Sequence, residues 1–381
     1  MTGYRLVIYL IPFVLLFSFG MDMYIPQLIV IGKEFQINAE ALQWTLNMYL
    51  LAFAGGQIVL GQLSDYYGRR RILMLATLGF IIASGLAVIV THLWQLLILR
   101  FIQGFCACGT RISAFAILRD SHKGAEIAKL YSYLAGAIGI SPAIAPMLGT
   151  VIGTAGWRYN FAFLCLLGVS CLLLCRKFDS SLPLIRQAPK FTIMWQVARH
   201  RRLVFFSVLS GVAIAHFFTF ISLSSYLIVQ TMHLNYWYFN YSFALFGVTM
   251  LIISQISGRL AYRFGNIAVI KTGLGLYLTS AVGLMGLALL PQLHFVSFCS
   301  ITVLGCAGGI LMNGPGIAEA LRDFDTNVGL AVSITGVVGY VTVTLIGETI
   351  VSLDKHNTLA WGAVLSVLII GLWLGLRKFD K

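Results

Sequence analysis

The sequence predicts an all-α membrane protein in which twelve transmembrane helices form two six-helix pseudo-repeats, with both termini in the cytoplasm. Three observations carry this prediction: long uncharged apolar segments, basic residues gathered in alternate gaps between them, and short motifs that recur in the two halves of the chain. The composition agrees, because 59% of the residues are hydrophobic and 10% are charged, whereas a soluble domain is about 25% charged.

Twelve apolar segments are long enough to cross a bilayer, which takes roughly 20 residues in a helix. They lie near residues 6–29, 41–63, 72–91, 94–118, 128–153, 158–175, 203–230, 237–258, 267–290, 294–318, 327–350 and 357–376. The first segment lacks a short apolar stretch ending in a small-residue cleavage site, so we expect it to be a retained span.

The distribution of Lys and Arg predicts the orientation of these spans. The gaps on the side of the N-terminus hold 21 of the 26 basic residues, the opposite side holds three (Lys33, Arg158 and Lys355), and Arg100 and Arg111 lie within a span. Basic residues favour cytoplasmic loops, so both termini are expected in the cytoplasm. A net charge of +13 that is confined to alternate gaps reflects topology, and we expect no nucleic-acid partner.

The two halves carry matching motifs. The segment "GQLSDYYGRR" (61–70) follows the second predicted span and "GRLAYRFGNI" (258–267) follows the eighth, while "AILRD" and "EALRD" end the fourth and tenth. This indicates a duplication, with six-helix bundles at 1–175 and 203–381 joined by a basic cytoplasmic linker at 176–202. Repeats of six spans are typical of transporters whose substrate site lies at mid-membrane between the repeats.

The quoted motifs resemble those of a known family. "GQLSDYYGRRR" (61–71) is similar to the loop signature of the major facilitator superfamily, Gly-x-Leu-x-Asp-x-x-Gly-Arg-Arg/Lys. A closer resemblance, mostly in the N-terminal half, is to the Bcr/CflA branch of drug:proton antiporters. It is carried by "MDMYIPQL" (21–28), "RFIQG" (100–104), "LRDSHKGAEIAKLYS" (118–132) and "PAIAPMLGTVIGTAGWRYNF" (142–161). The resemblance implies the major facilitator fold and proton-coupled transport without a cofactor.

The loop signature supplies a candidate cytoplasmic gate motif. Its members are Gly61, Asp65, Gly68, Arg69 and Arg70. The glycines permit close approach and a tight turn, and an Arg or a helix N-terminus favours the Asp65 charge. The resemblance implies that this contact latches the cytoplasmic side in the outward-open state; the alternative is that the arginines only anchor the topology. In the second copy Tyr262 stands where Asp65 would be, so we expect a one-sided latch.

Asp22 and Arg100 are charges inside predicted spans, where each costs about 2.5–3.5 kcal/mol on insertion scales. Their positions in spans one and four put both about 10 Å below the outer surface at 1.5 Å per residue. We therefore predict that they pair and couple transport to protons, with Asp22 binding and releasing the proton. A purely structural ion pair is the alternative, and Pro26 is expected to loosen the helix just outside Asp22.

Other polar and aromatic residues of the spans are candidates for the substrate cavity. Together with Arg100 they are Tyr24, Asn47, Gln103, Arg111, His216, Phe217, Phe220 and Asn313. For Arg111 the alternatives are a salt bridge to Glu319 or snorkelling to the surface. His216 is either a cavity-lining group or a core histidine hydrogen-bonded to Ser or Thr.

The predicted function is proton-coupled efflux of a drug- or metabolite-type compound by antiport in a bacterial inner membrane. Relatives carry a second acid before the Asp22 position, where this chain has apolar Val14, so the cavity is expected to be net positive. An anionic or zwitterionic metabolite such as a carboxylate siderophore is therefore the alternative substrate. The resemblance to the antiporter signature in span five is partial, since Ala145-Pro146-x-x-Gly149-Thr150 replaces Gly-Pro-x-x-Gly-Gly.

The remaining function classes have little support in the sequence. There is no Gly-x-x-x-x-Gly-Lys-Ser/Thr of a nucleotide-driven pump and no His-Glu-x-x-His of a metalloenzyme. We therefore expect neither enzymatic activity nor a metal or other cofactor. The expected partners are the bilayer, protons and a small-molecule substrate, with the chain acting as a monomer.

Overall fold

The computed structural model describes residues 3–121, 125–178, 191–324, 328–353 and 358–379, and within these ranges every regular element is a helix. By length and composition, twelve spans found among these described residues are able to cross a membrane. The predicted all-α class and the predicted number of spans are therefore confirmed. Residues 179–190 of the predicted linker lie outside the described residues.

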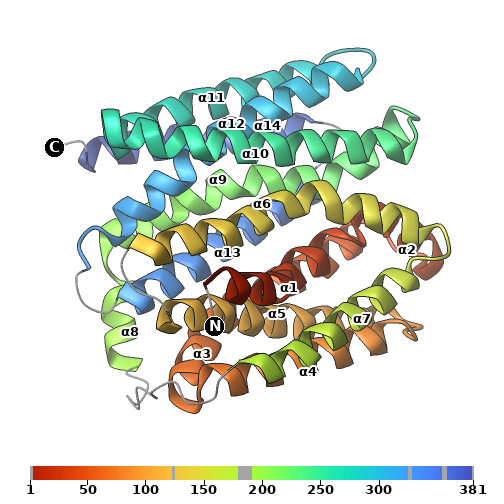
Figure 1. Cartoon of the computed structure of the whole chain (residues 1–381). Helices are drawn as coiled ribbons and strands as arrows, with labels where there is room; N and C mark the ends of the chain where they lie inside the picture. Colours follow the sequence, from red (N-terminus) through yellow and green to blue (C-terminus); the bar gives the residue numbers. More distant parts are fainter. Residues whose placement is uncertain (1–2, 122–124, 179–190, 325–327, 354–357, 380–381) are drawn as a thin grey trace. The chain divides into compact units, whose positions relative to one another are not determined.

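The chain forms two compact units, Met1–Phe191 (unit 1) and Thr192–Lys381 (unit 2). Their boundary falls within the linker predicted at 176–202. Unit 1 contains, in chain order (Figure 1), α1 (Gly3–Asp22), α2 (Leu28–Phe35), α3 (Ala39–Tyr67), α4 (Arg69–Ala87), α5 (Leu93–Ser121), α6 (Ala125–Gly153) and α7 (Arg158–Leu174). Helix α5 packs against α1, α3 and α4, while α6 packs against α1 and α7 against α4.

The helices of unit 2 follow the short helix α8 (Phe191–Ala198). They are α9 (Arg201–Tyr226), α10 (Tyr236–Phe264), α11 (Asn266–Ala288), α12 (Phe295–Leu321), α13 (Val328–Leu353) and α14 (Leu359–Leu376) (Figure 1). Helix α12 packs against α9, α10 and α11, while α13 packs against α9 and α14 against α11. In each unit a central helix, α5 or α12, thus packs mainly against three neighbouring helices.

The ends of these helices follow local sequence signals. Asn38 begins α3, and its side chain accepts a hydrogen bond from the backbone N–H of Ala41 at 2.9 Å, which satisfies one of the orphan donors of the first turn. Gly68 separates α3 from α4 with φ +101°, and Gly265 separates α10 from α11 with φ +82°. Only glycine adopts such angles without strain, so both motif loops turn at a glycine.

The first span differs from the continuous helix predicted at 6–29. Helix α1 ends at Asp22, a single 3-10 turn covers Ile25–Gln27, and α2 then runs to Phe35. Pro26 lies in that turn and has no N–H to continue the helical ladder, which confirms the loosening expected from it. The break follows directly after the acid, and the span ends six residues later than predicted.

Candidate functional site

The break in span one creates a polar position inside unit 1. Asp22 is the last residue of α1, and only 4% of its surface is exposed. Carbonyl groups in the last turn of a helix lack intrahelical partners and must bond elsewhere. The Gly20 carbonyl accepts a hydrogen bond from Nη1 of Arg100 at 2.6 Å. A side chain from α5 therefore satisfies the broken end of α1.

Arg100 is completely buried, and its three guanidinium nitrogens all have partners, which for Nη2 is Sδ of Met21 at 4.0 Å. Nη1 donates to Oε1 of Gln103 and Nε donates to the Thr45 carbonyl at 3.3 Å. The rings of Tyr24 and Tyr49 lie 4.3 and 4.2 Å from its central carbon. Hydrogen bonds and aromatic faces offset the cost of removing a cation from water, so the arginine is held in one place.

Asp22 and Arg100 are brought together as neighbours. Their charges interact, but no direct ion pair joins them among the described residues. Arginine keeps its charge at any physiological pH, so the pair is neutral when the carboxyl is ionised and carries +1 when it is protonated. One proton at Asp22 therefore decides whether a buried positive charge is compensated.

Two residues of α3 that sequence reasoning missed complete this site. The hydroxyl of Thr45 lies 2.9 Å from that of Tyr24, and the hydroxyl of Tyr49 donates to the Phe17 carbonyl at 2.8 Å. Thr45 and Tyr49 are four residues apart and so lie on one face of the helix. Two polar side chains four residues apart in an apolar span are the sequence signal that could have identified Thr45 and Tyr49.

Gln103 and Asn47, two predicted cavity residues, are both buried in unit 1. Nε2 of Gln103 donates to the hydroxyl of Ser84 at 2.8 Å, so this side chain links Arg100 to α4. Oδ1 of Asn47 accepts from Nε2 of Gln43 at 3.3 Å on the same helix. Gln103 therefore belongs to the Arg100 cluster.

Arg111 is half-buried on α5, about three turns from Arg100. Its guanidinium carbon lies 5.3 Å from the ring centre of Phe17 and 5.6 Å from that of Phe53. The Glu319 carboxylate, considered as its partner, bonds to Arg202 within unit 2. The described contacts of Arg111 are thus with aromatic faces.

His216 lies in the interior of unit 2. It is 1% exposed, its Nε2 is hydrogen-bonded to the Thr302 carbonyl at 2.8 Å, and its ring lies 5.1 Å from that of Trp361. The Tyr277 hydroxyl accepts from its backbone N–H at 3.2 Å. The ring is thus packed in the interior of unit 2, and its role in a substrate cavity stays a prediction.

The other predicted cavity residues of unit 2 have mixed environments. Phe220 is fully buried and stacks on Phe246 with ring centres 3.9 Å apart, whereas Phe217 is half-buried. The Asn313 carbonyl accepts a hydrogen bond from Ser210 at 3.4 Å. Phe220 is therefore a packing residue in this structure, and the roles of Phe217 and Asn313 in a cavity stay predictions.

The gate motif is organised around Arg69, the first residue of α4. Its guanidinium pairs with Asp65 one turn earlier and with Oδ2 of Asp120 at the end of α5, the latter at 3.0 Å. Gly68 supplies the turn between the helices. Arg69 is 8% exposed, so the ion pairs are shielded from solvent on the arginine side. The sequence predicted either an arginine or a helix N-terminus as the partner of Asp65, and in the structure Arg69 pairs with it.

The remaining motif residues differ in their surroundings. Nε of Arg70 donates to the Cys175 carbonyl at 3.1 Å, which connects α4 to the end of α7. A Cβ built at Gly61 meets no described atom within 4 Å. Gly61 is therefore not required for close packing among the described residues.

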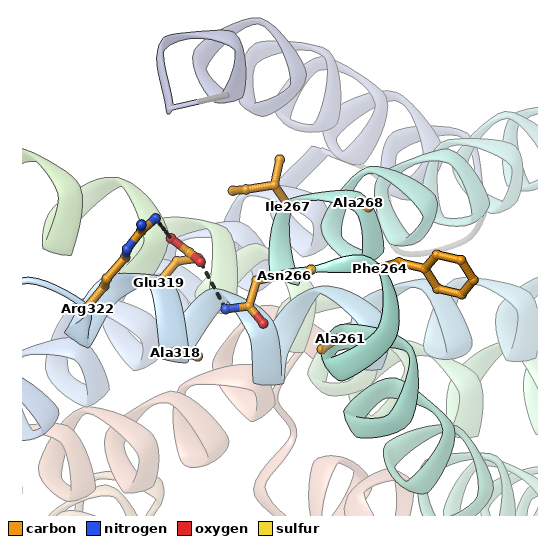
Figure 2. A pocket seen from close by; sticks show the side chains of 9 residues that line it. Ala261, Phe264, Asn266, Ile267, Ala268, Ala318, Glu319 and Arg322 are labelled. Atoms are coloured by element: carbon orange, nitrogen blue, oxygen red, sulfur yellow. Dashed lines mark hydrogen bonds and ion pairs between the residues drawn. The ribbon is translucent and has the colours of Figure 1, made fainter. Parts of the chain in front are cut away.

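The corresponding loop of unit 2 borders an open pocket of about 560 Å³. Figure 2 shows Glu319 between Arg322 and Asn266 at this pocket. Nδ2 of Asn266 donates to Oε1 of Glu319 at 2.9 Å, and Nη1 of Arg322 lies 3.6 Å from Oε2. Tyr262, at the position equivalent to Asp65, is 96% exposed. The Asn266 amide and the guanidinium groups of Arg202 and Arg322 thus hold the Glu319 carboxylate.

Comparison with known proteins places this geometry in context. The model of the family described as the Major Facilitator Superfamily matches residues 10–347. The chain is 29% identical over 378 residues to the chloramphenicol resistance protein of Pseudomonas aeruginosa, covering 96% of this chain and 89% of that one. It is 24% identical over 355 residues to a bicyclomycin resistance protein homolog of Haemophilus influenzae, covering 90% and 87%.

Solved structures are similar in fold. The xylose transporter of E. coli in a partially occluded inward-open conformation superposes with a TM-score of 0.76 at 16% identity, over 100% of this chain and 98% of that one. At this identity the likeness concerns the fold alone.

Proposed function

The chain belongs to the major facilitator superfamily, and we propose that it is a proton-coupled secondary transporter that exports a small amphipathic compound from bacterial cells by antiport. Twelve apolar helices and bacterial relatives along almost the whole chain identify a multi-pass membrane protein. We assign it to the inner membrane, because the basic residues follow the positive-inside distribution of a helical membrane protein.

The observation that carries proton coupling is the buried Asp22 beside Arg100 at the break in span one. A buried acid next to a permanent cation changes the net charge of the site by one when it takes up a proton. In a low-dielectric environment the protonated site, which carries a net positive charge, and the deprotonated site, which is neutral, are stabilised by different surroundings. Protonation at Asp22 can thereby be linked to the exchange between inward- and outward-facing conformations.

Alternating access is supported by the matching construction of the two units. In unit 1, α5 packs against α1, α3 and α4, while α6 packs against α1 and α7 against α4. In unit 2, α12 packs against α9, α10 and α11, while α13 packs against α9 and α14 against α11. We propose that the two units are six-helix pseudo-repeats whose relative movement exposes a site between them to each side in turn.

Efflux of an antibiotic-type compound is favoured over the anionic-metabolite alternative. Two relatives that align with 96% and 90% of this chain are named for resistance to chloramphenicol and bicyclomycin, and both compounds are uncharged molecules. We therefore expect an uncharged amphipathic molecule as substrate.

Transport into proteoliposomes tests this function. Chloramphenicol, bicyclomycin and citrate would be offered with and without an imposed pH gradient, with protein-free liposomes as the blank. We expect gradient-driven accumulation of at least one antibiotic and none of citrate, and loss of accumulation in Asp22→Asn. Glu348→Gln, an acid near the end of α13, is the matched control and should keep it. Gradient-independent uptake, or uphill uptake by Asp22→Asn, would contradict the assignment.

A further inference from the structure

Two glycines of α6 face the break in span one. A Cβ built at Gly149 would overlap the carbonyl oxygen of Met23, and one at Gly153 would overlap the side chain of Gln27. The two glycines are four residues apart and so lie on the same helix face. In α6, as in other membrane helices, small residues let two backbones approach closely, and here the approaching backbone is the broken segment.

The contact at Gly149 lies immediately beside the acid. Met23 follows Asp22, and its backbone N–H makes the last hydrogen bond of α1, to the Phe19 carbonyl at 3.1 Å. A movement of the Met23 carbonyl therefore moves the residue that carries the carboxyl. On the other side, Asn160 of α7 is fully buried and donates to the Gly149 carbonyl at 3.2 Å, which ties α6 to α7 at this level.

We propose that Gly149 is a positioning residue for Asp22: the absence of a Cβ at this residue lets α6 hold the end of α1 where the carboxyl lies beside Arg100. Side-chain bulk at residue 149 would push the Met23 carbonyl away from α6, because an atom of the backbone cannot rotate aside. Such a shift would change how readily the Asp22 carboxyl binds a proton. The importance of that change for transport rests on the proposed function.

The titratable and charged groups that interact with Asp22 are Arg100, Tyr24 and Tyr49. Arg100 of α5 acts on its charge, and Asp22 in turn acts on Tyr24 of its own span and on Tyr49 of α3. Helix α6 contributes no charge to this set among its described side chains. An effect of residue 149 on proton binding must therefore act through position.

The primary test reads the carboxyl directly and does not require transport. Infrared difference spectra of the reconstituted protein over a range of pH give the band of the protonated Asp22 carboxyl, with Asp22→Asn as the baseline. Gly149→Ala would be compared with Gly136→Ala, which makes the same change on the same helix where a Cβ meets no described atom within 4 Å. We expect the pH midpoint of the band to move by about half a unit or more in Gly149→Ala and to stay put in Gly136→Ala.

Gly153→Ala provides a second variant, which guards against failure of Gly149→Ala to fold. Its clash is with the flexible Gln27 side chain, so we expect a smaller midpoint shift, and one that Gln27→Ala reverses in the double variant. A purely structural role would lower the thermal stability of both variants and leave the pH midpoint of the carboxyl band unchanged.

The outcomes separate this inference from the proposed function. Unchanged midpoints in Gly149→Ala and Gly153→Ala would overturn the positioning role even if the protein exports antibiotics. A shifted midpoint would support it even if the wild-type protein moves none of the tested compounds, a result that would contradict the function instead. Where transport is measurable, its pH dependence should shift with the band.

Discussion

Arg100 is fully buried, and its guanidinium group donates to two backbone carbonyls and to a side-chain amide oxygen. Its bonds to Gly20 and Thr45 tie α5 to two other helices. The arginine therefore does more than balance the charge of Asp22, because it fixes the end of the helix that carries the proposed proton site. A planar group with several donors is needed for this, and lysine offers only a point charge.

Replacing Arg100 by Lys tests this geometric role while keeping the charge. We expect the rate of gradient-driven transport to fall by about tenfold or more. A lost hydrogen bond to a charged group is worth about 1.5–3 kcal/mol, and 1.4 kcal/mol corresponds to a factor of ten. The matched control is Arg111→Lys, whose aromatic contacts a lysine can retain, and which should reduce the rate by less than about threefold. Equal losses in both variants would contradict the distinction.

At the residue scale, sequence reasoning located Asp22, Arg100, Gln103 and Tyr24 because charge and polarity inside an apolar span are visible in the chain itself. It missed Thr45, although its hydroxyl meets Tyr24 and its carbonyl meets Arg100, because a threonine in an apolar helix is as readily explained by a bond to its own helix, which Thr45 also makes to Leu42. It left His216 open between two interpretations, since only the packing of α9 against its neighbours decides whether a histidine meets a cavity or the Thr302 carbonyl.

At the scale of elements, the α3–α4 turn depends on a single backbone conformation. Gly68 ends α3 and begins α4 with φ +101° and ψ +141°, and Arg69 directly after it makes ion pairs to both adjacent helix ends. The turn therefore determines where the arginine of the gate motif can reach. The same arrangement of glycine and first helical residue recurs at Gly265 and Asn266.

Gly68→Ala is expected to destabilise the protein, because a side chain makes this backbone conformation unfavourable by about 1–3 kcal/mol. Gly61→Ala, seven residues earlier in α3, should be neutral or stabilising by up to about 1 kcal/mol, since alanine favours helix and its Cβ meets open space. Reversible unfolding in detergent micelles measures both. A Gly68→Ala protein as stable as Gly61→Ala would show that the turn adopts another conformation.

The element-scale predictions succeeded where a pattern is periodic and long. All twelve spans were identifiable from apolar runs, and Pro26 indicated a weak point in the first. The precise break after Asp22 and the extension to Phe35 were not predictable, because they depend on what surrounds the chain there. Arg100 satisfies the carbonyl freed at the break, and Glu34 near the far end is bound by Trp157 and Arg158.

At the scale of the whole molecule, the charge distribution makes the strongest remaining prediction, the orientation in the membrane. The 21 basic residues on one side against three on the other predict that both termini are cytoplasmic. Fusions at Lys381 test this: green fluorescent protein there should fluoresce, and alkaline phosphatase should be inactive. Alkaline phosphatase fused after His92, in the predicted outer loop between spans three and four, should be active, and the reverse pattern would contradict the orientation.

The asymmetry is spread over many gaps, so changing the two arginines of the gate motif, Arg69 and Arg70, to glutamine should leave the topology intact while breaking the Arg69 ion pairs. Loss of transport in that variant with unchanged fusion activities would separate a gating role of the motif from simple anchoring.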